Sequence, residues 1–259
     1  MTRWLGQRPV IVSIALLLLT WALVARAGWI GKTLLASPEE VLGVLARAWH
    51  PADSGQAVYT HALHTIGRAL AGWAIALVGG GILGLLLGFN PRAYRATEPL
   101  LEFARAVPPI MAFPLFLVAF DFGTAAFVWT IAVGCLPIMV LAVARGIQGL
   151  DRTRQDLLAV HDVSRPLRTV ASIVEIMPST FFGARLTLSI SLIVAVVTEM
   201  VFSPRSGFAV GALAKDSQIS FDTPTFFACI VVIGTYGYAM NAVMRRVEWR
   251  LSGEGRRAP

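Results

Sequence analysis

The chain has 259 residues, of which 56% are hydrophobic and 14% are charged, whereas soluble domains average about 25% charged residues. Several apolar runs approach the ~20 residues that a helix needs to cross a ~30 Å hydrocarbon core. This composition excludes a water-soluble fold and predicts an all-α, polytopic membrane protein whose spans and loops use nearly all of the chain. The net charge of +7 does not indicate nucleic-acid binding, because the basic residues gather in loops between the apolar runs.

Six membrane spans are predicted, with the N- and C-termini on the cytoplasmic side. The first span follows Arg3 and Arg8 and is interpreted as an uncleaved anchor, because Ala25-Arg26-Ala27 makes a poor signal-peptide cleavage site. The loops placed inside hold most of the basic residues, as the positive-inside rule requires. The predicted spans are Pro9–Ala25, His61–Phe89, Glu98–Phe120, Ala125–Ile147, Pro178–Phe202 and Thr225–Arg245.

Between the first two spans, Ser37-Pro38-Glu39-Glu40 predicts the start of a helix. Serine is a preferred N-cap, proline suits the first helical position, and glutamates are favourable in the first turn. The apolar residues that follow recur at helical spacing. This helix either lies along the outer membrane surface or is a plain connector, and periodicity alone does not choose between them.

The second span carries glycine at every fourth position, at Gly80, Gly84 and Gly88. This small-xxx-small spacing lets two membrane helices approach closely, so the three glycines are predicted to be packing positions. Gly79 to Gly84 also spells a dinucleotide-binding fingerprint, but no strand precedes it. Gly31-Lys32-Thr33 lacks the earlier glycine of a phosphate-binding loop. We therefore expect no nucleotide or other cofactor to be bound by this chain itself.

Prolines cluster near the start of the third span, in Val107-Pro108-Pro109 and at Pro114, and Pro137 lies inside the fourth. Each proline removes a backbone donor and kinks or breaks a helix. Broken helices at membrane depth are tolerated where protein or a water-filled cavity covers the freed carbonyls, which fits a moving translocation path. Ordinary membrane helices also contain proline, so the simpler interpretation stays open.

Charged side chains within or near the predicted spans are candidates for a translocation path or for structural ion pairs: Arg68, Arg105, Arg185 and Glu199. Such residues are costly in lipid and usually face the bundle interior, a cavity or a partner. The arginines are expected to pair with Glu102 or Glu199, to reach the membrane interface, or to contact a substrate. The sequence leaves these alternatives open.

The chain shows no candidate catalytic residues and no metal site. His61 and His64 have a spacing that a metal could use, but no cluster of cysteine, aspartate or glutamate joins them. Cys135 and Cys229 each lie within an apolar run and are interpreted as packing residues. We therefore do not expect an enzyme.

A polar segment separates the fourth and fifth spans and is long enough to form helices of its own. Asp151 to Val160 predicts a first helix, and His161 to Val163 predicts a turn. Ser164 is expected to cap a second helix whose first turn tolerates Pro166. The segment therefore predicts a cytoplasmic helix-turn-helix, over about residues 150–177, that contacts a partner.

Short motifs along almost the whole chain resemble, in order and spacing, those of permease subunits of bacterial ABC importers that work with a solute-binding protein. The resemblance is to the subgroup that handles sulfonates, taurine, nitrate and related small solutes. The motifs are Leu35-Ala36-Ser37-Pro38, Thr65-Ile66-Gly67-Arg68-Ala69-Leu70-Ala71-Gly72-Trp73, Pro99-Leu100-Leu101, Val107-Pro108-Pro109, Pro114-Leu115, Asp121-Phe122-Gly123, Gly183-Ala184-Arg185, Thr198-Glu199-Met200 and Ser206-Gly207-Phe208.

The resemblance implies one permease domain over residues 1–259 in the bacterial inner membrane. It implies an ATP-driven importer in which this chain forms the path for a small solute, such as a sulfonate, taurine or nitrate. The implied partners are cytoplasmic ABC ATPase subunits, which bind the ATP, a second permease subunit and a periplasmic solute-binding protein.

In that family, a cytoplasmic helix-turn-helix sits in a groove of the ATPase and passes its motion to the spans. Its pattern is eroded here: His161 or Asp162 replaces a glycine, and Gln155 or Asp156 replaces a glutamate. A Leu-Pro pair of the family becomes Ile173-Val174. The erosion suggests that the second permease is a different chain with an intact segment. The coupling candidates are Gln155, Asp156, Ala159, His161, Asp162, Ser164 and Arg165.

Two rival functions remain open at this point. An ATPase-independent secondary transporter or channel would need acidic or histidine relays within the membrane, and Glu199 alone gives little support. It would also leave the cytoplasmic segment unexplained. A membrane-embedded enzyme would need a nucleophile, metal or acid–base pair facing a cavity, and the sequence offers none.

Overall fold

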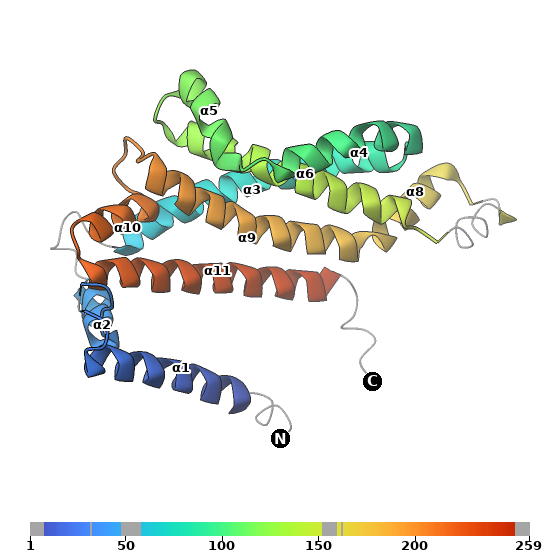
Figure 1. Ribbon diagram of the computed structural model, residues 1–259. Helices are drawn as coiled ribbons and strands as arrows, with labels where there is room; N and C mark the ends of the chain where they lie inside the picture. Colours follow the sequence, from blue (N-terminus) through green and yellow to red (C-terminus); the bar gives the residue numbers. More distant parts are fainter. Residues whose placement is uncertain (1–7, 32, 48–57, 152–159, 162, 252–259) are drawn as a thin grey trace.

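The computed structural model describes residues 8–31, 33–47, 58–151, 160–161 and 163–251, which form helices and, within these ranges, no strands. The helices are α1 (Arg8–Ala27), α2 (Pro38–Arg47), α3 (Val58–Gly88), α4 (Pro91–Ala106), the 3-10 helix η1 (Pro109–Ala112), α5 (Phe113–Phe120), α6 (Thr124–Gln148), α8 (Arg165–Glu175), α9 (Met177–Val201), α10 (Val210–Ile219) and α11 (Thr223–Leu251). The helices α3, α6, α9 and α11 form a bundle, with α2 and α10 at one end and α8 at the other (Figure 1).

Both ends of the described chain lie toward the end of the bundle that carries α8. Helix α1 runs from that side toward the end with α2, and helix α11 runs in the opposite direction, toward the side of α8 (Figure 1). Because α8 belongs to the segment predicted to be cytoplasmic, this arrangement agrees with the prediction that both termini share the cytoplasmic side. We refer to the α8 end as the inner end and to the end with α2 and α10 as the outer end.

Four helices of the described chain, α3, α6, α9 and α11, are long and apolar enough to cross a membrane. They match the predicted second, fourth, fifth and sixth spans to within a few residues at most ends, and these four predictions are confirmed. The first predicted span falls within α1, whose described apolar stretch, Val12–Ala27, is shorter. Pro137 lies inside α6, which continues past it.

The predicted third span, Glu98–Phe120, is broken into two helices at the predicted prolines and begins earlier than expected. Helix α4 already begins at Pro91, and α5 continues at an angle of 93° to it. The break follows from Val107, which is extended because a residue before proline is disfavoured in the α conformation. Pro108 and Pro109 then lack the N–H groups that would continue the helix. The bent pair counts as a fifth candidate span only if both arms are taken together.

Glycines on one face of α3 allow close contact with α6. A Cβ atom added at Gly84 would lie 2.7 Å from the Cβ of Val143, and one added at Gly80 would lie 2.8 Å from the Cβ of Met139. Gly88 faces α6 in the same way, with an added Cβ 3.2 Å from the backbone of Ala144. The three glycines predicted from their spacing therefore all lie at the contact between these two helices.

The same row contains two positions that the sequence analysis omitted. Gly72 faces Ile131, whose Cβ would lie 2.7 Å from an added Cβ, and Ala76 is completely buried. Both continue the four-residue spacing toward the outer end of α3. Ala76 interrupts the glycine repeat and so separates Gly72 from the three glycines that were recognised, although alanine serves as a small interface residue equally well.

Helix α2 begins where the sequence predicted. The N–H of Ser37 donates to Glu40 Oε2 at 2.8 Å, and the N–H of Glu40 donates to Ser37 Oγ at 3.3 Å, which is a capping box. Val41 packs against Ala228 of α11 in a small buried cluster. Helix α2 therefore contributes to the packing of the outer end and joins α1 to the bundle.

Candidate functional site

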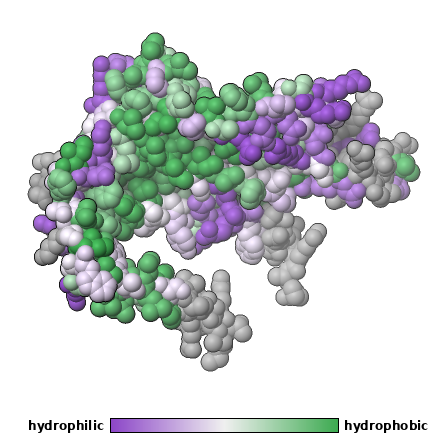
Figure 2. Space-filling view, in the orientation of Figure 1, coloured by the Kyte–Doolittle hydropathy of each residue, from purple (hydrophilic) through white to green (hydrophobic). Residues whose placement is uncertain are grey.

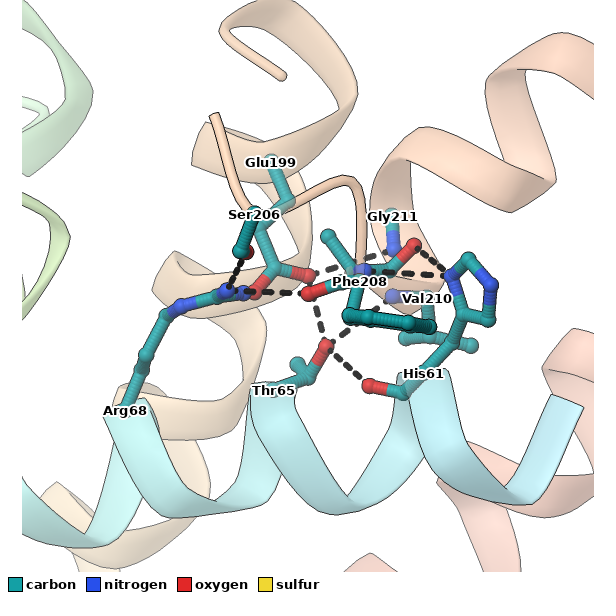
Figure 3. A network of polar contacts seen from close by, with 9 residues as sticks. His61, Thr65, Arg68, Glu199, Ser206, Phe208, Val210 and Gly211 are labelled. Carbon is teal, nitrogen blue, oxygen red and sulfur yellow. Dashed lines mark hydrogen bonds and ion pairs between the residues drawn. The ribbon is translucent and has the colours of Figure 1, made fainter. Parts of the chain in front are cut away.

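A network of buried polar groups joins α3 to the end of α9 at the outer end of the bundle (Figure 3). Thr65 and Arg68 lie three residues apart on α3, on the face that meets Glu199 of α9. The loop between α9 and α10 closes over them. We call this group the outer network; its residues are His61, Thr65, Arg68, Glu199, Ser206, Phe208, Ala209, Val210 and Gly211.

The carboxylate of Glu199 is the centre of the outer network. Arg68 Nη1 donates to Oε1 at 2.5 Å, while Thr65 Oγ1 and the N–H of Gly211 donate to Oε2 at 2.7 and 3.2 Å. Glu199 is completely buried, and the side chain of Arg68 is 2% exposed. Both carboxylate oxygens thus have charge-assisted hydrogen bonds, as a buried charge requires.

The other end of the Arg68 guanidinium holds the loop between α9 and α10. Nη2 donates to Ser206 Oγ at 3.0 Å and to the carbonyl oxygen of Phe208 at 2.9 Å, and the guanidinium carbon lies 5.5 Å from the centre of the Phe127 ring. Nearby, the N–H of Ala209 donates to His61 Nδ1 at 3.1 Å. Of the two alternatives for Arg68 and Glu199, this geometry favours the structural ion pair.

Arg185 pairs with a residue that the sequence analysis did not consider. Its Nη1 donates to Oε2 of Glu248 in α11 at 2.8 Å, and one turn further along, Asn241 Nδ2 donates to Ser189 Oγ at 3.0 Å. These contacts tie the inner halves of α9 and α11 together. Both charged side chains stay partly exposed, at 35% and 27%, because the pair lies near the inner end.

A second group of charged side chains lies where α4 packs on α6. Arg145 of α6 forms ion pairs with Glu98 and Glu102, and Glu102 also pairs with Arg105 on its own helix. Tyr94 completes the group by donating to Glu98 Oε1 at 2.7 Å and accepting from Arg145 Nε at 3.2 Å. We call these five residues the α4 polar face.

The α4 polar face extends along the side of the bundle toward the middle of α6. Pro109, at the bend after α4, lies against Gly134 near the middle of α6, where an added Cβ would lie 2.5 Å from the Cβ of Pro109. Arg105 is four residues before this bend, and its side chain is 51% exposed. Figure 2 shows hydrophilic residues on the α4 side of the bundle, beside a hydrophobic surface. A half-exposed arginine at this depth is too costly in lipid, so the face meets water or a partner.

The pairing of Arg105 with Glu102 was one of the expected outcomes and is confirmed, but Tyr94, Glu98 and Arg145 were not expected beside them. Glu98 was not selected because the predicted third span began there, whereas α4 begins seven residues earlier, at Pro91. Asn90 supplied the missing signal, since its side chain accepts a hydrogen bond from the N–H of Ala93 and caps α4. An asparagine followed directly by proline is a typical helix start.

The predicted coupling segment is only partly within the described residues. Gln155, Asp156, Ala159 and Asp162 lie outside them. His161 is exposed in a turn, and Ser164 occupies the N-cap position of α8 without a capping hydrogen bond from its side chain. The backbone of Arg165 begins α8, and Pro166 lies in its first turn, as predicted.

Helix α8 is amphipathic and presents an apolar row to its surroundings. Leu167, Val170 and Val174 are exposed at helical spacing, whereas Ser172 and Ile176 are buried toward the bundle. The inner end therefore carries an apolar surface on a short helix outside the membrane-spanning bundle.

In the part of the chain that the structure describes, no three metal-binding side chains come together. His61 and His64 instead contact the ring of Phe208, at centroid distances of 5.5 and 5.2 Å. Cys135 and Cys229 are buried and unbridged.

Comparisons with known proteins match this architecture over most of the chain. A model of the family described as "Binding-protein-dependent transport system inner membrane component" matches residues 77–253. The aliphatic sulfonates transport permease protein SsuC of Bacillus subtilis is 25% identical over 252 residues, covering 93% of the chain and 87% of the relative. The taurine transport system permease protein TauC of Escherichia coli is 23% identical, covering 96% and 92%.

A third relative and a solved structure extend the comparison. The nitrate import permease protein NrtB of Leptolyngbya laminosa is 23% identical over 190 residues, covering 73% of the chain and 67% of the relative. The inward-facing MetNI methionine ABC transporter contains a chain that is similar in structure, with a TM-score of 0.64 at 16% identity, over 73% of this chain and 93% of that one.

Proposed function

The chain belongs to the family of inner membrane components of binding-protein-dependent transport systems, and we propose that, as the permease subunit of an ABC importer, it carries a small organic or inorganic anion. Sulfonates, taurine and nitrate are the solutes named for its relatives. A secondary transporter or channel has less support, because the family works with a binding protein. We place the subunit in a bacterial cytoplasmic membrane.

The α4 polar face is the observation that carries the proposed path. It brings charged groups to the middle of the bundle, on a helix that breaks there. Arg105 has one carboxylate partner, Glu102, and half of its side chain is exposed, so its guanidinium keeps donors for an anion. Arg145 is held by two glutamates and positions the face.

The test of this path is uptake by cells that carry the whole importer. We expect Arg105→Gln to lower the rate of anion uptake about tenfold, because a hydrogen bond to a charged group contributes ~1.5–3 kcal/mol. Arg105→Lys keeps the charge and should keep more of the rate. The measurement is accumulation of radiolabelled taurine, an alkanesulfonate and nitrate, each with the amount of complex in the membrane determined by immunoblot.

Arg92→Gln is the matched control, since Arg92 is an exposed arginine at the beginning of the same helix. We expect this variant to transport at the unmodified rate. Equal uptake by the Arg105→Gln and Arg92→Gln variants would remove Arg105 from the path.

We further propose that residues 1–259 form one permease domain whose helix-turn-helix, over about residues 150–177, docks on an ABC ATPase. The exposed apolar row of α8 supports this docking. The coupling candidates on the preceding segment, Gln155, Asp156, Ala159, His161 and Asp162, would lie in the same contact, with Ser164 and Arg165 at the start of α8. ATP is bound and hydrolysed on the partner, and this chain holds no cofactor.

We expect Val170→Asp to weaken ATPase association, because it places a charge in a desolvated contact. The measurement is the ratio of ATPase to permease after affinity purification in mild detergent. Val170→Leu keeps the apolar surface and serves as the control that should retain the ATPase. A Val170→Asp complex with an unchanged ATPase ratio would place the docking site elsewhere.

The importer also needs a second permease subunit and a periplasmic solute-binding protein. The departures of the coupling segment from the family pattern support a heterodimer, in which the other permease carries the intact segment. Mass spectrometry of the purified complex tests this arrangement. A complex that contains this permease twice, and no other, contradicts it.

A further inference from the structure

A polar pocket with a volume of about 280 Å³ opens at the outer end of the bundle, between α10 and the beginning of α11. It lies beside the outer network, because His61 contributes to both. The polar residues that line it are His61, Asp216, Ser217, Ser220, Asp222 and Thr225. We call it the outer pocket.

The charge of the outer pocket is negative. Two carboxylates, those of Asp216 and Asp222, line it, and its lining contains no lysine or arginine. Asp222 has a structural role as well, since its Oδ1 accepts the N–H of Thr225 in the first turn of α11 at 3.3 Å. Asp216 lies in the last turn of α10, where a negative charge is unfavourable because the helix dipole is negative there. A cation in the pocket would offset this repulsion.

Two hydroxyl groups in the wall strengthen this interpretation. Ser217 is 5% exposed and Thr225 is 8% exposed, and both line the pocket. Among the described residues, neither side-chain oxygen has a hydrogen-bond partner, and neither oxygen is sealed from the cavity. Buried hydroxyls normally have partners, so these two are available to a molecule inside the pocket.

The polar atoms that line the outer pocket decide which cation fits. The described residues contain no cluster of three metal-binding side chains, so a divalent metal is not matched. Two carboxylates and two hydroxyls offer acceptors in several directions, which suits a group with several N–H donors and one positive charge. We propose that the outer pocket binds a primary ammonium group, with Asp216 and Asp222 supplying the charge and Ser217 and Thr225 supplying further acceptors.

A thiol reporter tests this proposal on the purified full-length chain. Ser220 lines the pocket and is exposed, so Ser220→Cys should react with a maleimide, while the native Cys135 and Cys229 are buried. We expect ethylammonium chloride to slow this reaction several-fold at millimolar concentrations. Tetramethylammonium chloride carries the same charge without N–H donors and should have little effect.

The acidic residues are tested in the same reporter background. Asp222→Asn keeps an oxygen that can accept the N–H of Thr225. The double substitution of Asp216→Asn and Asp222→Asn therefore removes both negative charges from the pocket and preserves this hydrogen bond. We expect this double substitution to abolish the protection by ethylammonium. Glu39→Gln, which removes an exposed carboxylate at the outer end, should retain it. Equal protection by the two salts, or protection that survives in the double variant, overturns the proposal.

An amine solute and a lysine side chain of the binding protein share this chemistry. A second experiment adds the solute-free binding protein that co-purifies with the importer, before and after acetylation of its lysines, which removes their charge. If only the unmodified binding protein protects the thiol, the source of the ammonium group is a docked lysine. If ethylammonium protects the thiol but neither form of the binding protein does, the source is a free amine. Only this second experiment rests on the proposed function, so its failure leaves the ethylammonium result intact.

Discussion

Replacing Glu199 by glutamine lowers the free energy of unfolding of this protein by about 3–5 kcal/mol, the usual cost of removing one partner from a buried ion pair. Arg68 then remains as a buried charge with no carboxylate. Whichever way the amide is turned, its NH2 group also meets existing donors, either Arg68 at the place of Oε1 or Thr65 and the N–H of Gly211 at the place of Oε2. The measurement is equilibrium unfolding in mixed micelles with increasing dodecyl sulfate, followed by circular dichroism.

Glu248→Gln is the matched control for this effect. It removes the carboxylate of the Arg185 pair, in which both side chains are partly exposed, so the loss should stay within about 1 kcal/mol. Two variants with equal losses would show that the outer network is not a buried electrostatic contact. Hydrogen exchange should also show that the Glu199→Gln variant loses protection in the loop between α9 and α10, which Arg68 holds against α3. This result would support the structural role of Arg68.

Gly84→Ala is expected to destabilise the bundle by about 1–3 kcal/mol, the range for overpacking a well-filled interior. The added Cβ would lie 2.7 Å from the Cβ of Val143 and 3.0 Å from the carbonyl oxygen of Val140. Neither is the free end of a flexible side chain, so α3 and α6 must move apart. The same unfolding experiment measures this loss.

Gly81→Ala provides the control on the same helix. An added Cβ at Gly81 meets nothing within 4 Å, and alanine is favoured over glycine in a helix interior by roughly 0.5–1 kcal/mol. We therefore expect this variant to be as stable as the unmodified protein or slightly more so. A loss at Gly81 as large as the loss at Gly84 would mean that close contact with α6 is not the reason for the glycine row.

Features that depend on residues close together in the chain were predicted better than contacts between residues far apart in it. The four long spans were predicted to within a few residues, because apolar length is a property of consecutive residues. The start of α2 was found through Ser37 and Glu40, whose capping bonds span three residues. The packing face of α3 was found in part, because Gly80, Gly84 and Gly88 repeat at helical spacing, whereas Ala76 was not distinguished from other alanines.

The position of the break after α4 was foreseen from the prolines, but the angle between its two arms was not. Pro108 and Pro109 indicated a break, yet the predicted span ran through them because its apolar composition continues on both sides. The angle of 93° between the two arms depends on where α4 packs. Pro109, at the bend, packs against Gly134 of α6. Local sequence therefore indicates where the helix breaks, whereas the direction of the chain after the break depends on tertiary packing.

The sequence by itself determined that this protein is a helical membrane protein and where its long apolar helices lie, because both rest on composition and short-range spacing, whereas its function as a permease was indicated by the resemblance of its motifs to a known family. Only the tertiary structure decided which partners the charged side chains have. Arg68 and Glu199 are 131 residues apart in the chain and bond directly, while Arg105 stays half exposed on the α4 polar face. Pairing energies depend on distance and burial in three dimensions, and the same is true of the outer pocket, whose walls come from three helices.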